Sequence, residues 1–82
     1  MASTEQKVFI SDIGLAATLL TLQFKLVGLE RTSDKRMDFV FAATEGIETA
    51  IGDFWGDKTI EVPIQSLFHN FRQLKNRLYA EK

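Results

Sequence analysis

The chain has 82 residues and no cysteine, 45% of its residues are hydrophobic, and its formal net charge is −1. This length predicts one domain over residues 1–82, with an ordered core over about residues 7–79, because half of so short a chain could not bury a core of its own. The composition excludes disulfides and thiolate chemistry. No apolar run approaches the roughly 20 residues that span a bilayer, so we expect no membrane partner and a soluble, cytoplasmic protein.

The first part of the sequence predicts a strand followed by a buried helix. Lys7–Ile10, with the sequence KVFI, is the strand, and Ser11 is a suitable N-cap because its hydroxyl can accept a free backbone N–H of the first turn. The predicted helix covers residues 12–22 and is apolar on nearly all sides. A helix of this kind is buried against more than one neighbour.

The middle of the sequence predicts a β-hairpin. One strand covers residues 24–31, the polar stretch TSDKR forms the turn with Ser33 and Asp34 at its centre, and Met37–Ala43 returns antiparallel. In this pairing Phe39 and Phe41 share a face with Leu26 and Gly28.

The opposite face of the predicted hairpin is apolar as well. Its residues are Val27, Leu29, Val40 and Ala42. An exposed patch of several apolar side chains is unusual in a monomer. Either helices cover both faces of the sheet, or helices cover one face and a second copy of the chain covers this patch.

The last part of the sequence predicts two more helices. Thr44 is the expected cap of a helix that Gly56 ends in the left-handed conformation. Thr59–Val62 alternates as a short edge strand does, and Pro63 suits the first position of the last helix. The element order β-α-β-β-α-(β)-α predicts an α+β domain with a small, mostly antiparallel sheet packed with three helices.

The residues that carry enzyme chemistry are few. His69 is the only histidine, three of the serines, Ser11, Ser33 and Ser66, suit a cap, a turn and a solvated helix face, and no acid in an orienting position accompanies Ser66 and His69. The carboxylates lack the spacing of a calcium loop, and the glycines form no phosphate-binding loop. We therefore predict that the chain is not an enzyme and has no catalytic, cofactor-binding or metal-binding residue.

Two clusters of cations suggest a nucleic-acid partner. They lie at the hairpin tip and along the last helix, and their members are Arg31, Lys35, Arg36, Arg72, Lys75 and Arg77. A basic hairpin beside a basic helix could follow a phosphate backbone. Charged helix faces are more commonly just solvated, and the net charge is balanced.

Several of these stretches together resemble a known family. The run F-x-S-D-x-x-L-A-A-x-L-L spans Phe9–Leu20, F-x-L-x-G-x-E-R spans Phe24–Arg31, and an F-x-F strand spans Phe39–Phe41. In this order they resemble the small prokaryotic, phage-associated domains of the family of unknown function DUF5659, over about residues 8–79. The resemblance implies an architecture and a mobile-element setting, but no activity or site.

The sequence thus favours a small non-catalytic interaction domain that forms a homodimer through the patch of Val27, Leu29, Val40 and Ala42. The alternative is an accessory nucleic-acid-binding protein that uses the two basic clusters.

Overall fold

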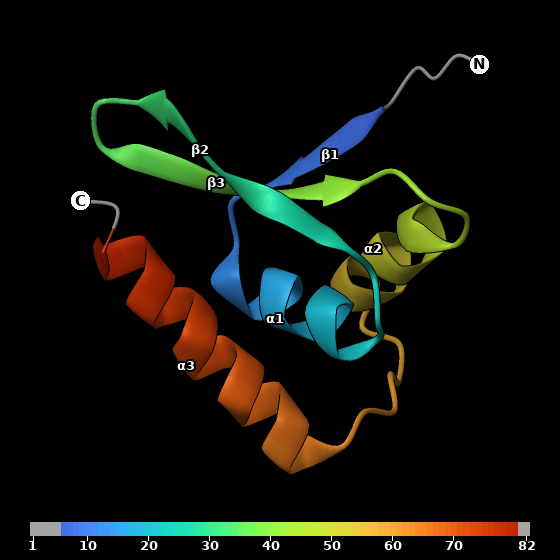
Figure 1. Ribbon diagram of the computed structural model, residues 1–82. Helices are drawn as coiled ribbons and strands as arrows, with labels where there is room; N and C mark the ends of the chain where they lie inside the picture. Colours follow the sequence, from blue (N-terminus) through green and yellow to red (C-terminus); the bar gives the residue numbers. More distant parts are fainter. Residues whose placement is uncertain (1–5, 81–82) are drawn as a thin grey trace.

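The computed structural model describes residues 6–80 (Figure 1). Its elements in chain order are β1 (Lys7–Ile10), α1 (Ile13–Thr21), β2 (Leu26–Ser33), β3 (Arg36–Ala42), α2 (Ile47–Trp55) and α3 (Ile64–Ala80). The strands form one antiparallel sheet in the order β1-β3-β2. The predicted α+β class is confirmed, although residues 59–62 form no strand. Residues 1–5 and 81–82 of the predicted domain lie outside the described residues.

All three helices lie on one side of the sheet (Figure 1). α1 is the middle layer, since it packs against β1 on one side and against α2 and α3 on the others. This position explains why α1 is apolar almost all round, and Ala16 and Ala17, both fully buried, allow its neighbours to approach closely. Of the two arrangements open from the sequence, the one with helices on both faces is therefore wrong for the described residues.

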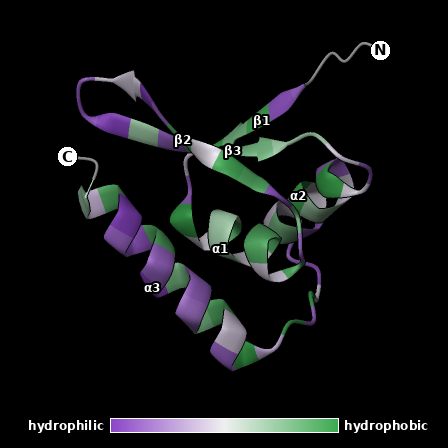
Figure 2. Cartoon of the chain, viewed as in Figure 1, coloured by the Kyte–Doolittle hydropathy of each residue, from purple (hydrophilic) through white to green (hydrophobic). Residues whose placement is uncertain are grey.

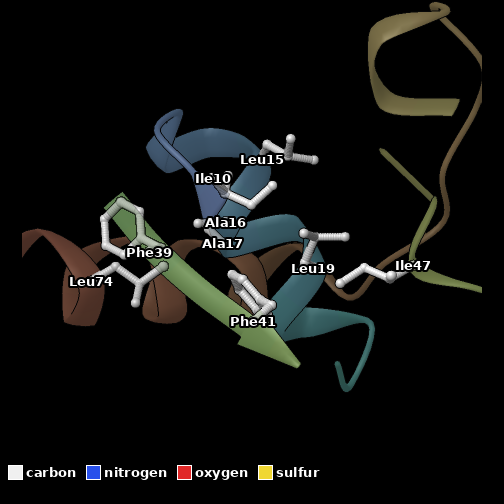
Figure 3. Close-up of a cluster of buried hydrophobic side chains, with 9 residues drawn as sticks. All are labelled: Ile10, Leu15, Ala16, Ala17, Leu19, Phe39, Phe41, Ile47 and Leu74. Carbon is white, nitrogen blue, oxygen red and sulfur yellow. The ribbon is translucent and has the colours of Figure 1, made fainter. Parts of the chain in front are cut away.

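The core lies between the central strand β3 and α1. Phe39 and Phe41 point from β3 into the core, where Phe39 lies beside Leu74 of α3 and Phe41 lies near Leu19 of α1 (Figure 3). Ile47 joins the same cluster from α2. Every helix thus contributes a buried side chain to one continuous core, as Figure 2 also suggests from the apolar stripes of the helices.

An irregularity in the hairpin changes which residues share a face. Leu26 pairs with Phe41, but Gly28 pairs with Val40 and Leu29 with Phe39, so the register shifts by one residue around Val27. An extra residue of this kind is a β-bulge, and a shift by one residue turns every later side chain to the other face. The predicted faces of Gly28 and Leu29 are therefore wrong: Leu29 packs against the core and Gly28 lies on the opposite side.

Two boundaries of the elements also differ from those predicted. The hairpin turns at Asp34 and Lys35, because β2 continues to Ser33. Pro63 precedes α3 instead of opening it, and its carbonyl accepts a hydrogen bond from the Leu67 N–H at 3.0 Å.

The ends of α2 are built from backbone rather than from the predicted cap. Thr44 gives no side-chain cap; its carbonyl accepts the Ile47 N–H at 3.2 Å, and the helix follows Gly46, whose φ of 93° is in the left-handed region. At the other end Gly56 has a φ of −87°, and the left-handed residue is Asp57 at 61°. Asp tolerates this conformation better than most residues because its short polar side chain can bond locally.

The cap of α1 is Asp12 and not Ser11. Asp12 has extended backbone angles, and its Oδ1 accepts the Leu15 N–H at 2.9 Å. The carboxylate also places a negative charge at the positive end of the helix dipole.

We expect Asp12→Ala to lower the free energy of unfolding by about 1 kcal/mol, because a free N–H of α1 loses its acceptor. Urea denaturation followed by circular dichroism measures this change. Ser11→Ala is the matched control and should change the stability by a few tenths of a kcal/mol at most. A larger loss for Ser11→Ala than for Asp12→Ala would contradict the assigned cap.

Candidate interaction surface

The side of the sheet that faces away from the helices is called here the outer face. On β3 the side chains of Phe39 and Phe41 point inward, so the alternating residues Asp38, Val40 and Ala42 point outward. Residues directly opposite each other in an antiparallel sheet project to the same side. The register therefore places on the outer face, besides these three, Lys7, Phe9, Lys25, Gly28 and Glu30, together with the bulge residue Val27.

The centre of the outer face is apolar. Phe9 pairs with Val40, and Val40 pairs in turn with Gly28. Phe9 and Val27 are 47% and 50% exposed, whereas Val40 is only 3% exposed. Val40 is shielded because it lies on the central strand, with Phe9 on one side and the bulge on the other. The surface that a partner would meet is therefore formed mainly by Phe9 and Val27.

The structure keeps part of the patch predicted from the sequence and adds to it. Val27, Val40 and Ala42 lie on the outer face, but Leu29 lies on the inner face. Sequence reasoning missed Phe9. In the strand KVFI, Phe9 must lie on the opposite face of the sheet from Val8 and Ile10. Only the pairing of β1 with β3 shows that Phe9 lies on the outer face.

One end of the outer face carries two lysines. Lys7 on β1 lies opposite Ala42 on β3. On the other side of β3, the Ala42 N–H donates to the Lys25 carbonyl at 3.0 Å. Lys7, Lys25, Ala42 and Val27 border the same hollow. The two ammonium groups therefore flank the small Ala42 side chain.

The other end carries two carboxylates. Glu30 lies directly opposite Asp38. Like charges directly opposite in a sheet repel each other and destabilise the pairing. The outer face is thus polarised along its strands, with a positive end (Lys7 and Lys25), an apolar centre and an acidic end (Glu30 and Asp38), where Arg36 beside Asp38 offsets part of the negative charge.

The Asp38 carboxylate is buried without a full set of partners. Its side chain is 13% exposed, and its nearest cation is Arg36, whose Nε lies 3.6 Å from Oδ1. Oδ1 itself is buried and accepts no hydrogen bond from the residues that the structure describes. A buried acceptor without a donor costs free energy, and the ion pair with Arg36 offsets part of that cost.

Two of the cations predicted to contact nucleic acid are engaged within the hairpin. At the hairpin tip Arg31 donates from Nη1 to the Asp34 carbonyl at 2.9 Å, and Arg36 pairs with Asp38. On α3 the exposed Arg72 and Lys75 are three positions apart and lie on neighbouring parts of the helix surface.

Arg77 is also exposed, but it is five positions beyond Arg72 and faces a different side of α3. Lys35 is exposed at the hairpin turn. A continuous track for a phosphate backbone would need these side chains on one face, so the arrangement gives weaker support to nucleic-acid binding than the sequence clusters did.

The remaining polar groups form no converging set. Ser66 and His69 border a hollow between the end of α1 and the start of α3, and no carboxylate is among the described residues that line it. Within residues 6–80, no group of three or more His, Asp and Glu side chains is placed to hold a metal ion. No helix in the same range is both long enough and apolar enough to cross a membrane.

Comparison with known proteins gives one match. A family described as a domain of unknown function, DUF5659, matches residues 5–80. This range includes all the elements of the fold and all the residues of the outer face. No curated protein and no solved structure matches the chain.

We expect Gly28→Ala to raise the free energy of unfolding of the isolated subunit by about 0.5–1 kcal/mol. A Cβ built at Gly28 meets no atom within 4 Å, and alanine loses less backbone entropy on folding than glycine. Gly46→Ala is the contrasting variant and should lower the stability by about 1 kcal/mol or more, because its φ is 93°. Urea denaturation at low protein concentration measures both. A loss of stability in Gly28→Ala would contradict an open outer face.

Proposed function

Since the chain belongs to the DUF5659 family, whose description assigns no activity, we propose its role from the geometry of the sheet. The chain is a small, non-catalytic interaction domain that forms a homodimer through the outer face. The single observation that carries this proposal is that all three helices lie on one side of the sheet and leave Phe9 and Val27 half exposed on the other.

The size of the apolar centre indicates how strong such a dimer is. Burying a whole Phe or Val side chain contributes about 1.5–3 kcal/mol, so the exposed halves of Phe9 and Val27 contribute roughly 1 kcal/mol each. Two copies double this gain to about 4 kcal/mol, and association costs about as much or more in lost freedom of motion. The apolar centre therefore contributes about as much free energy as association costs, and we expect a weak dimer that forms only at high protein concentration.

Nucleic-acid binding, the second function predicted from the sequence, stays a prediction. Fluorescence anisotropy with generic duplex DNA and RNA at about 50 mM salt tests it, because phosphate contacts are strongest at low salt. Binding that Lys75→Glu abolishes, in a wild-type chain that stays monomeric, would favour this function over self-association.

We expect the wild-type chain to sediment with a mass that rises from that of the 9.3 kDa monomer as its concentration increases. The double variant Phe9→Ser, Val27→Ser should stay monomeric over the same range and keep its circular dichroism spectrum, because both side chains are half exposed in the isolated subunit. Sedimentation equilibrium measures both masses.

The matched control is Phe68→Ser on α3, which removes an equally exposed aromatic side chain away from the outer face. It should leave the association unchanged. A wild-type chain that remains monomeric at about 1 mM, or a control that dissociates as readily as the double variant, would overturn the proposal.

A further inference from the structure

We infer that two copies of the chain stack face to face with their strands antiparallel, so that the positive end of each outer face lies over the acidic end of the other. This inference rests on the proposed self-association and adds the arrangement of the two copies and the residues that select it. It is carried by the charge distribution of the outer face, which has Lys7 and Lys25 at one end and Glu30 and Asp38 at the other.

Two symmetric ways of stacking the outer faces can be compared. A homodimer with a self-complementary surface has a two-fold axis, and for stacked sheets that axis lies in the interface. If the axis runs along the strands, each end of the face meets the same end of the other copy. Lys7 then meets Lys25, and like charges repel.

If the axis instead runs across the strands through Val40, the ends are exchanged. Asp38 and Ala42 are each two residues from Val40 on β3, in opposite directions. Asp38 of one copy therefore lies over Ala42 of the second copy, and Ala42 of the first lies over Asp38 of the second. Lys25, directly before β2, accepts a hydrogen bond from the Ala42 N–H, and Glu30 on β2 is paired with Asp38, so Lys25 lies over Glu30 of the second copy. The apolar centres meet at the axis.

The distances suit contacts of this kind. Stacked sheets lie about 10 Å apart, and neighbouring outward residues of a strand are about 7 Å apart. A lysine side chain spans most of the gap between two sheets while its alkyl stem covers apolar surface. The Lys25 ammonium therefore reaches the Glu30 carboxylate of the second copy, and two such pairs form by symmetry.

The same arrangement brings positive charge of the second copy near Asp38. Asp38 lies over Ala42 of the second copy, whose small side chain leaves room, and that position is flanked by Lys7 and Lys25. Positive charge at that position attracts the Asp38 carboxylate. It also offsets the repulsion between Asp38 and Glu30 within one subunit.

A charge exchange tests this arrangement. Lys25→Glu places two carboxylates over each other, and Glu30→Lys places two lysines over each other, so each variant alone should dimerise at least about tenfold more weakly than the wild type. Mixed in equal amounts, the two variants should associate with near wild-type affinity, because each reversed charge then meets its opposite. Both residues are exposed in the isolated subunit, so neither change should alter the fold.

The matched controls are Lys75→Glu and Glu48→Lys, which make the same changes of net charge on exposed helix positions. Neither control should weaken the dimer by more than about twofold, because exposed charges distant from the contact are largely screened. Sedimentation equilibrium and native mass spectrometry of the mixture measure dimer formation.

The outcomes separate this inference from the proposed function. A monomeric wild type overturns both. A wild-type dimer that Lys25→Glu and Glu30→Lys do not weaken, or a mixture of weakened variants that does not recover, overturns the antiparallel stacking alone. The copies then associate through another surface, such as the free edge of β1.

Discussion

The packing of Phe39 and Phe41 against α1 is the contact on which the rest of the structure depends. Both side chains come from the central strand, and both are almost fully buried. α1 accepts them because its own surface is apolar in every direction, which lets it bind the sheet on one side and the other helices on the rest. Because this helix occupies the middle of the molecule, α2 and α3 pack their apolar sides against α1 and not against the far side of the sheet.

The bulge at Val27 adapts β2 to this arrangement. Without it, the regular alternation of the strand would send Leu29 to the side away from the helices. The extra residue returns Leu29 to the core beside Phe39 and leaves Val27 and Gly28 on the outer face. A single inserted position thus improves the core and at the same time reduces the apolar area of the outer face.

The outer face that results is small, polarised and only partly apolar. Phe9 and Val27 border a nearly buried Val40, lysines lie at one end, and carboxylates lie at the other. A face with this distribution of charge favours a partner with the opposite distribution, and a second copy turned end for end has it. The modest apolar area fits reversible association better than a permanent dimer, whose interface resembles a core cut in half.

The sequence by itself determined the class of fold, the element order and most residues of the core, Leu29 excepted, because hydrophobic periodicity and helix or strand length are local properties of the chain. The buried character of α1 and the inward direction of Phe39 and Phe41 were readable in this way. Local caps were less certain, since Ser11 and Asp12 are both good capping residues and only the backbone angles distinguish them.

Only the tertiary structure decided which residues share the outer face. The register of a hairpin with a bulge depends on which pairing buries the most apolar surface against the helices, and no local pattern around Val27 specifies it. The same holds for Phe9, which lies on one surface with Val27 and Val40 because two strands far apart in the sequence pair with each other. The charges at the two ends of that surface come from three strands, so their polarity exists only once the sheet has formed.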